Sequence, residues 1–304
     1  MTQAPVTPAE VRILARDRHA VVFAHNYQRA EVQAIADVVG DSLELARRAA
    51  TVSAEVIVLA GVRFMAETAA ILAPGKTVLL PRADAGCPMA DMITAPQLAA
   101  WKAENPGVPV VMYVNSSAEV KALTDVCCTS ANAVEVVRSL RAPRVLFGPD
   151  RNLGRWIAGQ LPEVEVTVWD GCCPIHDQVS LEMVLEARAA HPGAPVIAHP
   201  ECRPEVSAEA DHVFSTSQMI RWAAKAGEPE IIVVTEGGLL TGLAAAAPQT
   251  RFIGLKPPMI CEDMKRTTLT DVRDVLRDLS GVVAVPGEVA DPARASLERM
   301  TEIG

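Results

Sequence analysis

Short apolar runs alternate with segments of helical periodicity along the chain. The runs are rich in Val, Ile and Ala and are continuous, as is typical of parallel strands buried on both faces. Helical segments such as 43–50 and 63–72 separate them. This order predicts an α/β fold with parallel sheets and crossover helices. The predicted strands are 21–24, 56–60, 77–80, 110–112, 145–147, 164–168, 196–198, 231–234 and 251–254.

A pattern of polar residues recurs three times within this alternation. An Asp is followed five positions later by a hydroxyl residue, and the Asp residues are 88 and 86 positions apart. Twelve positions before each Asp begins a polar triplet, and 48 to 50 positions after it stands a cysteine. This recurrence predicts triplication of a unit of about 87 residues. The Asp residues are Asp37, Asp125 and Asp211, the hydroxyl residues are Ser42, Ser130 and Thr216, the triplets begin at His25, Tyr113 and His199, and the cysteines are Cys87, Cys173 and Cys261.

The triplication decides between two and three domains, which the length of 304 residues leaves open. We predict three αβα sandwich domains with small parallel sheets, related by a pseudo-threefold axis around a central site. The units are 1–88, 89–173 and 174–269, and we expect the C-terminal segment 270–304 to pack back on the first.

The composition excludes several classes of protein. Half of the residues are hydrophobic, which excludes disorder for most of the chain. The formal charge of −9 provides no basic field for nucleic acid or an anionic membrane. No apolar run approaches the roughly 20 residues that span a bilayer, and the first residues lack the order of a signal peptide. We therefore expect a cytoplasmic protein that binds no nucleic acid and no membrane.

The seven cysteines point to thiol chemistry or metal binding in such a compartment. If the three units surround a common axis, the cysteines of the repeat meet at the centre. Three thiolates can hold a zinc ion or three irons of a [4Fe–4S] cluster, whose remaining iron then acts as a Lewis acid. The alternative is three buried small hydrophobes. The other four, Cys127, Cys128, Cys172 and Cys202, are interpreted as core residues or neighbours of the site.

The triplets end predicted strands, where parallel sheets gather functional groups. Both tyrosines of the chain, Tyr27 and Tyr113, lie in them. The hydroxyl residues fall where helices are predicted to begin, so they serve as helix caps, as anion ligands or as both. His176, which follows Cys173, and the loops at 149–150 and 236–238 are weaker candidates for the same centre.

The chain resembles the quinolinate synthase family from residue 25 to about residue 270. The resemblance rests on ordered motifs. They are His25-Asn-Tyr-Gln, Gly40-Asp-Ser-Leu, Gly86-Cys-Pro-Met-Ala-Asp-Met92, Tyr113-Val-Asn-Ser-Ser117, Cys128-Thr-Ser-Ala-Asn132, Gly171-x-Cys-x-x-His176, His199-Pro-Glu-Cys202, Ser215-Thr-Ser-Gln218 and Cys261-x-x-Met-Lys265.

The resemblance implies an enzyme of NAD biosynthesis that condenses iminoaspartate with dihydroxyacetone phosphate to quinolinate, phosphate and water. It also implies three αβα domains around a [4Fe–4S] cluster, and an L-aspartate oxidase or dehydrogenase that supplies iminoaspartate. The implied cluster ligands are Cys87, Cys173 and Cys261; the implied substrate-binding residues are His25, Ser42, Tyr113, Asn115, Ser130, His199, Glu201 and Thr216; and the implied catalytic residues are Tyr27, Tyr113, His199 and Glu201.

The chain departs from the family pattern at three positions. Phe214 replaces a glycine before Ser215, Cys172 adds a thiol beside Cys173, and Cys261 stands alone rather than in a C-x-x-C-x-x-C motif. Two other functions fit three cysteines in three units. One is an iron–sulfur reductase acting on an isoprenoid diphosphate, which requires a basic pocket, and the other is a sensor or structural module that holds zinc or a cluster.

Overall fold

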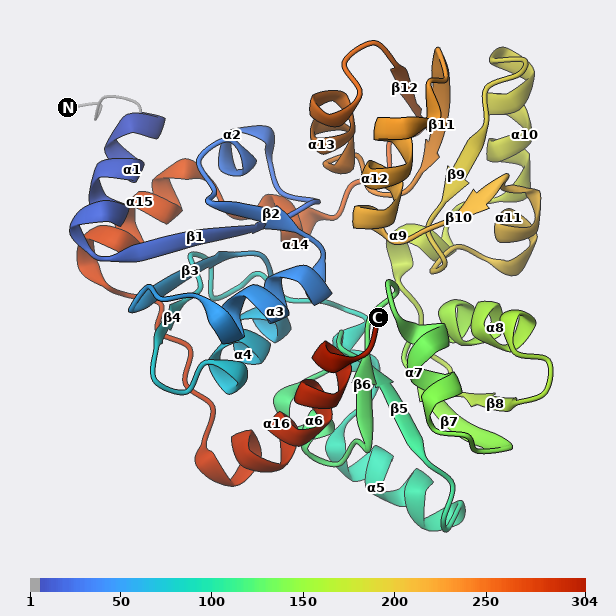
Figure 1. The fold of residues 1–304 in the computed structure, drawn as a ribbon, viewed down its shortest axis with the longest axis horizontal. Helices are drawn as coiled ribbons and strands as arrows, with labels where there is room; N and C mark the ends of the chain where they lie inside the picture. The colour runs from blue at the N-terminus through green and yellow to red at the C-terminus, as the bar shows by residue number, and fades with distance from the viewer. Residues whose placement is uncertain (1–5) are drawn as a thin grey trace.

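The computed structural model describes residues 6–304 and contains three four-stranded sheets in which every strand pair is parallel (Figure 1). The three sheets share one strand order, in which the first strand of the unit lies between the second and the third. They are β2-β1-β3-β4, with β1 (Ala20–His25), β2 (Val38–Gly40), β3 (Val56–Ala60) and β4 (Thr77–Leu79); β6-β5-β7-β8, with β5 (Val110–Tyr113), β6 (Val126–Cys128), β7 (Arg144–Gly148) and β8 (Glu165–Val168); and β10-β9-β11-β12, with β9 (Val196–Ala198), β10 (His212–Val213), β11 (Glu230–Val234) and β12 (Arg251–Gly254).

Helices connect the strands and cover both faces of the sheets, and the three units lie around a common centre (Figure 1). In chain order they are α1 (Pro8–Asp17), α2 (Ala30–Gln33), α3 (Ser42–Thr51), α4 (Arg63–Leu72), the 3₁₀ helix η1 (Ala90–Met92), α5 (Ala95–Glu104), α6 (Ala118–Ala122), α7 (Ala133–Ser139), α8 (Arg151–Gln160), α9 (Pro174–Asp177), α10 (Leu181–Ala190), α11 (Pro204–Glu209), α12 (Thr216–Ala226), α13 (Leu239–Ala246), α14 (Glu262–Lys265), α15 (Leu269–Asp278) and α16 (Gly287–Glu302).

The predicted fold class is confirmed, because three equivalent parallel sheets carry the three copies of the repeat. The sequence pattern missed one edge strand in each unit, namely β2, β6 and β10. These strands have only two or three residues, too few for a periodicity to show.

The repeated Asp residues explain how such short strands are held. Each Asp directly precedes an edge strand and accepts a hydrogen bond through Oδ2 from a backbone amide of the neighbouring strand. The donors are the amides of Val22, Val110 and Val196, at 2.8, 2.7 and 2.7 Å from Asp37, Asp125 and Asp211. The Asp of the repeat is therefore a structural residue, in contrast to the triplets, hydroxyl residues and cysteines of the same repeat.

The C-terminal segment lies against two units. Helix α15 packs against α1, and Val282 forms an antiparallel bridge with Leu79 at the edge of the first sheet. Helix α16 packs against α6 and β6 of the second unit and against α4 of the first. Its last residues reach the centre of the molecule, where Arg47 of α3 donates to the carbonyl oxygen of Thr301 at 2.8 Å (Figure 1).

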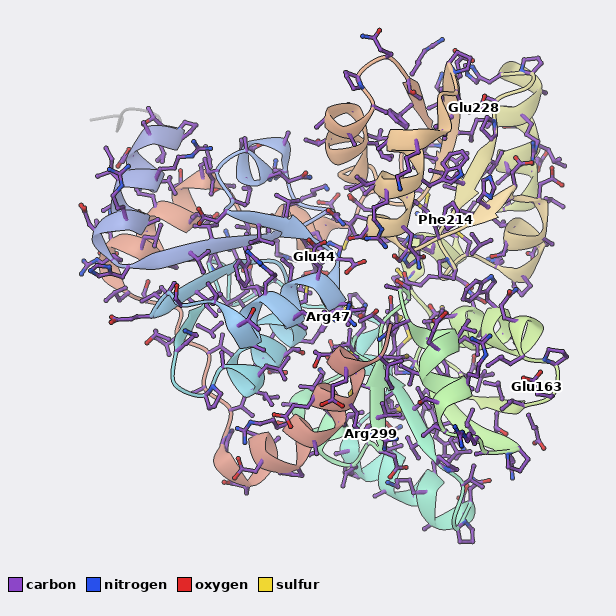
Figure 2. All side chains as sticks on the ribbon, viewed as in Figure 1. Glu44, Arg47, Glu163, Phe214, Glu228 and Arg299 are labelled. Atoms are coloured by element: carbon purple, nitrogen blue, oxygen red, sulfur yellow. The ribbon has the colours of Figure 1, made fainter. Side chains whose placement is uncertain are left out.

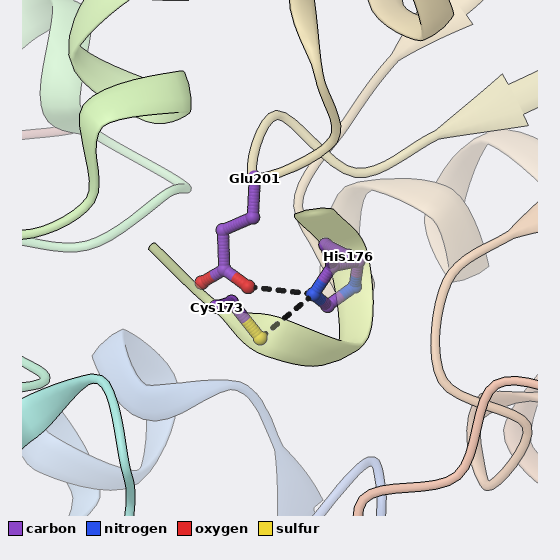
Figure 3. A group of neighbouring side chains, drawn as sticks. All are labelled: Cys173, His176 and Glu201. Carbon is purple, nitrogen blue, oxygen red and sulfur yellow. Dashed lines mark hydrogen bonds and ion pairs between the residues drawn. The ribbon is translucent and has the colours of Figure 1, made fainter. Parts of the chain in front are cut away.

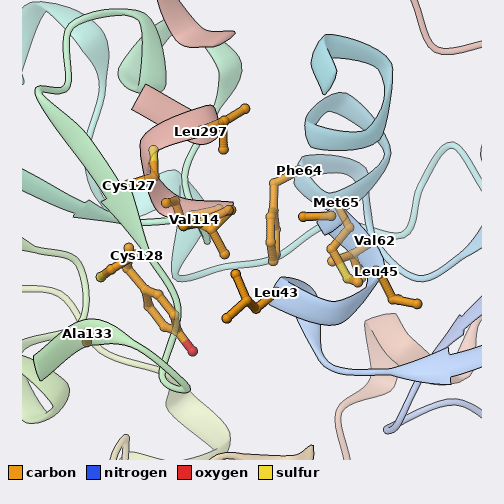
Figure 4. Packing of buried hydrophobic residues seen from close by; sticks show 14 of the residues in the cluster. Leu43, Leu45, Val62, Phe64, Met65, Val114, Cys127, Cys128, Ala133 and Leu297 are labelled. Carbon is orange, nitrogen blue, oxygen red and sulfur yellow. The ribbon is translucent and has the colours of Figure 1, made fainter. Parts of the chain in front are cut away.

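One hydrophobic core extends through all three units. Figure 4 shows part of it, where Leu43 and Phe64 of the first unit face Val114 and Cys128 of the second, next to Leu297 of α16. Cys127, Cys128 and Cys202 are buried in the cores, as predicted. Within residues 6–304, no helix has the length and apolar character needed to cross a membrane.

Candidate active site

All of the site residues predicted from the sequence line one cavity of about 280 Å³, to which each unit contributes. The cavity lies where the carboxyl ends of strands from the three sheets meet, as expected for parallel sheets. The residues are His25, Tyr27, Ser42 and Cys87 of the first unit; Tyr113, Asn115, Ser130 and Cys173 at the end of the second; and His199, Glu201, Thr216 and Cys261 of the third.

The histidines of two triplets are held in the same way. The amide of Tyr27 donates to Nδ1 of His25 at 3.1 Å, and the amide of Glu201 donates to Nδ1 of His199 at 3.4 Å. Since Nδ1 accepts, Nε2 carries the hydrogen of the neutral ring. Nε2 of His199 lies 3.2 Å from the hydroxyl of Ser130. Both rings therefore offer a hydrogen-bond donor to a ligand.

Burial keeps these two imidazoles uncharged. It lowers the pKa of His25 to about 4 and the pKa of His199 to about 3, against the attraction of nearby carboxylates. Near neutral pH the rings are neutral donors, so they bind anions through hydrogen bonds rather than through charge.

Acidification is expected to destabilise the protein through His25. The unfolded chain binds a proton at this residue below about pH 6.5, whereas the folded chain does so only near pH 4. Between these values the unfolded state binds more protons, so stability falls as pH falls. The contribution is about 2 kcal/mol between about pH 7 and pH 5. Urea unfolding of wild type and His25→Asn, matched in iron content, measures it; equal losses in both proteins contradict it.

The three hydroxyl residues are not the caps of their helices. Ser42 and Thr216 are the first residues of α3 and α12, but the caps are Asp41 and Ser215, whose side chains accept from the amides of residues 44 and 218. The hydroxyl of Thr216 instead accepts a hydrogen bond from Nδ2 of the Asn26 side chain at 2.9 Å. Since other residues serve as caps, the hydroxyls are available for a ligand.

Ser130 differs from its two counterparts, and its prediction as a helix start is wrong. It lies in a turn, three positions before α7 begins. The side chain of Asn132 accepts from the amide of Thr129 at 2.9 Å and closes this turn, which delays the helix. Ser130 nevertheless lines the cavity with the others.

A continuous chain of hydrogen bonds crosses the cavity wall. Tyr27 Oη lies 2.6 Å from Thr235 Oγ1, which lies 2.8 Å from Nε2 of His176. Nδ1 of His176 lies 2.8 Å from Glu201 Oε2 (Figure 3). Tyr113 Oη donates to Glu201 Oε1 at 2.7 Å. The order hydroxyl, imidazole, carboxylate is that of a hydrolase triad.

The charges within this chain are set by burial and by mutual contacts. Burial alone raises the pKa of Glu201, but hydrogen bonds from His176 and Tyr113 to the carboxylate outweigh it and lower the pKa below its usual value. Burial, with Glu201 nearby, raises the pKa of Tyr27 and of Tyr113 well above the usual value. Glu201 is thus a buried carboxylate, and both phenols keep their protons.

The three cysteines of the repeat converge on the same cavity, each just before or at the start of a short helix. Cys173 and Cys261 are the caps of α9 and α14, and Cys87 lies three positions before η1. In each case a backbone amide of the following turn favours the thiolate, namely that of Ala90, His176 or Met264.

Burial nevertheless dominates the titration of these thiols. It raises the pKa of Cys87 to about 12 and raises the pKa of Cys173 and Cys261 as well. A cation among them offsets this cost, since metal ligands must be deprotonated. Soft thiolates from three units, with amides directed at the sulfurs, fit a bound iron–sulfur cluster.

Comparison with known proteins places this site in a family. The family model of the quinolinate synthetase A protein matches residues 9–302. The chain belongs to the quinolinate synthase family. It is 50% identical over 295 residues to the quinolinate synthase of Geobacter sp. (strain M21), covering 97% of each chain, and 52% identical over 291 residues to that of Methanoregula boonei (strain DSM 21154 / JCM 14090 / 6A8), covering 96% of each. It is also 50% identical over 301 residues to that of Geobacter metallireducens (strain ATCC 53774 / DSM 7210 / GS-15), covering 99% of each.

The resemblance seen in the motifs is therefore confirmed, and the chain belongs to an enzyme family of NAD biosynthesis. The departure at Phe214 leaves its loop intact in this quinolinate synthase family member. Phe214 stacks on His212 with ring centroids 5.2 Å apart, on the third unit (Figure 2). The next residue, Ser215, keeps both bonds of a capping box with Gln218, so Thr216 still lines the cavity.

Thr235 is not predicted from the sequence, and His176 is only a weaker candidate there. His176 had a signal in its spacing from Cys173, but the same spacing suits a structural cap. Thr235 had none, because the equivalent strand ends of the other units carry Gly61 and Pro149 instead of a hydroxyl. A search for recurring residues cannot find a group that only one unit carries.

Proposed function

We propose that this chain catalyses the condensation of iminoaspartate with dihydroxyacetone phosphate to quinolinate, phosphate and water, with a [4Fe–4S] cluster at Cys87, Cys173 and Cys261. The observation that carries the proposal is the meeting of one cysteine and the first and third residues of one triplet from each unit in a single cavity. Seven unpaired cysteines suit the reducing cytoplasm, where an L-aspartate oxidase or dehydrogenase supplies iminoaspartate.

The protein residues bind the two acidic substrates without cationic side chains. No Lys or Arg is among the lining residues of the cavity within the described part of the chain. Hydroxyls at Ser42, Ser130 and Thr216 and the two neutral imidazoles supply the donors instead. A pocket of this kind suits small carboxylates and a single phosphate, and disfavours an isoprenoid diphosphate, whose phosphates call for basic residues.

The side-chain oxygen of Asn115 supports a ligand in the same place. Asn115 lines the cavity, and its Oδ1 is buried without a hydrogen-bond partner in the described structure. Because an unpaired buried acceptor is costly, we assign to it a donor on the substrate, either a hydroxyl or the imine N–H.

Removing one hydroxyl is expected to weaken substrate binding and little else. In Ser42→Ala, Ser130→Ala or Thr216→Val, KM for one substrate should rise about 10- to 150-fold, because a hydrogen bond to a charged group is worth about 1.5–3 kcal/mol. Steady-state kinetics with each substrate varied in turn measures this, and the exposed Ser53→Ala is the control. Unchanged KM values for both substrates in all three variants exclude these residues as ligands.

The hydrogen-bonded chain provides a path for protons. Tyr27 can accept a proton from substrate as it passes its own phenol proton to Thr235, which in turn passes its hydroxyl proton to Nε2 of His176, while Glu201 stabilises the imidazolium that forms. Tyr113 holds the other carboxylate oxygen and presents a hydroxyl to the cavity. When bound, the cluster supplies an open iron that acts as a Lewis acid toward a substrate oxygen.

A metal site of another kind is suggested by Cys173, His176 and Glu201, whose ligand atoms lie within 4.8 Å of one another (Figure 3). Both ring nitrogens of His176 already have partners, Glu201 at 2.8 Å and Thr235 at 2.8 Å. This double contact favours the triad over a zinc site and a sensor function.

The decisive experiment is an assay of protein purified and reconstituted without oxygen. We expect quinolinate to form from iminoaspartate and dihydroxyacetone phosphate, and the visible thiolate-to-iron absorption to accompany full activity. Absence of quinolinate from protein that carries a complete cluster contradicts the proposal. Full activity of a zinc-loaded, iron-free protein contradicts the cluster assignment alone.

A further inference from the structure

We propose that the buried ion pair Glu236–Lys265 is a positioning device. It links the backbone at Cys261 to the loop that carries Tyr27. The inference rests on the proposed function, since it concerns the placing of a proposed cluster ligand and a proposed catalytic phenol. These two groups come from different units and must meet at one cavity. The pair lies between them, and neither of its members belongs to the repeat.

Glu236 is anchored completely on its own unit. The residue lies two positions after the end of β11, next to Thr235, and its side chain is 1% exposed. Oε1 accepts from the amide of Cys261 at 3.2 Å, and Oε2 accepts from the amide of Gly238 at 2.7 Å. Lys265 Nζ lies 2.8 and 2.9 Å from the two oxygens. The carboxylate therefore fixes the backbone at the third cysteine and neutralises the lysine.

Lys265 carries the link to the first unit. Its ammonium group also donates to the carbonyl oxygen of Tyr27, and its side chain is only 14% exposed. A second hydrogen bond links the same two segments, since Nε of Arg29 in the first unit donates to the carbonyl oxygen of Lys265 at 2.7 Å. Helix α14, which Cys261 caps, thus holds both ends of the segment 27–29.

Gly238 shows how closely these groups approach. A Cβ atom at this position would lie 2.6 Å from Lys265 Nζ and 2.6 Å from the carbonyl oxygen of Tyr27. Gln33 donates to the carbonyl oxygens of Gly238 and Gln28, at 3.0 and 2.9 Å, and so keeps the glycine against the loop. Any side chain here separates the lysine from the loop without changing a charge.

The pair is better explained by positioning than by stability. The desolvation free energy of two buried charges is about as large as the attraction between them. A well-packed neutral pair would therefore stabilise the fold to the same extent. A neutral pair lacks the ammonium group of Lys265. That one group donates to both carboxylate oxygens of Glu236 in the third unit and to the carbonyl oxygen of Tyr27 in the first. Errors of about 1 Å in placing a reacting group cost on the order of a hundredfold in rate.

Three variants test the device: Lys265→Met, Gly238→Ala, and the neutral double variant Lys265→Met/Glu236→Gln, which avoids an unpaired buried carboxylate. The control is the exposed Lys225→Met. Each protein is reconstituted without oxygen and examined for iron content, for kcat and KM, and for hydrogen exchange in peptides covering residues 25–33. The lysine and glycine changes are also made in a Tyr27→Phe background.

We expect kcat to fall about 30-fold or more in all three variants, with KM within about threefold and iron content unchanged. Exchange at residues 25–33 should become faster, and the changes should have no further effect on the residual rate of Tyr27→Phe. The device is rejected if exchange there is unchanged, if the loss of rate follows a loss of iron, or if it multiplies with Tyr27→Phe. Failure of the wild type to form quinolinate rejects the proposed function instead, and hydrogen exchange and iron content then decide the linkage alone.

Discussion

Serine in place of Cys87, Cys173 or Cys261 is expected to abolish quinolinate formation and the visible absorption of the cluster. The three thiols come from separate units, line one cavity and are buried enough that their pKa values lie above the usual range. A serine hydroxyl is a poor ligand for iron, and it leaves one corner of the site without a soft anion. We expect kcat to fall by more than the 10- to 100-fold typical of residues outside the ligand shell.

Cys127→Ser is the matched control for this series. Cys127 is buried and lies 3.4 Å from the hydroxyl of Ser296, so serine keeps its size and has a partner. Iron and sulfide content, absorption and kcat should remain near the wild-type values. Retention of a complete cluster and activity by one of the three ligand variants removes that cysteine from the ligand set.

The fold could be predicted from the sequence because its most informative residues recur. Strands β3, β9 and β12 begin and end where the apolar runs do. The repeated Asp residues were visible as a pattern, but their function was not. Only the structure shows that Asp37 and its counterparts hold edge strands too short to be recognised.

The site could be predicted to the same extent and for the same reason. The repeated cysteines, the repeated hydroxyl residues and the first and third residues of each triplet all line the cavity. Thr235 and Lys265 could not be assigned a role from the repeat, because each occurs in the third unit alone. Each contacts Tyr27, which belongs to the first unit. Contacts of that kind depend on how units pack, which residue spacing within a unit does not specify.

The acidic character of the chain is compatible with acidic substrates because the donors are local. The net charge of −9 acts over the whole surface, whereas the cavity offers hydroxyls at the first turns of α3 and α12. Helix N-termini attract anions within a turn's length. In the proposed function, small anions are therefore selected by the geometry of these donors rather than by a general positive field.

Glu201→Gln is expected to lower kcat by about 10³-fold or more while leaving the cluster in place. Glutamine has nearly the same shape and still accepts from Tyr113, but its amide is uncharged and cannot stabilise an imidazolium at His176. The buried carboxylate is kept ionised by the hydrogen bonds from His176 and Tyr113, which lower its pKa, so its charge is present throughout the neutral range. Removing the charge of Glu201 interrupts the proton path from Tyr27 through Thr235 and His176. Neighbouring polar atoms along this path are 2.6–2.8 Å apart.

Members of one path act as a unit, so their losses should not add. His176→Asn and Thr235→Val should each lower kcat, and combining either with Glu201→Gln should cost little more than Glu201→Gln alone. Glu163→Gln, an exposed change at the outer edge of the second unit (Figure 2), provides the control. Single-turnover rates at equal iron content measure these effects. Additive losses would show that Glu201 acts on the substrate independently of His176, and a Glu201→Gln rate within tenfold of wild type would remove the carboxylate from the proton path.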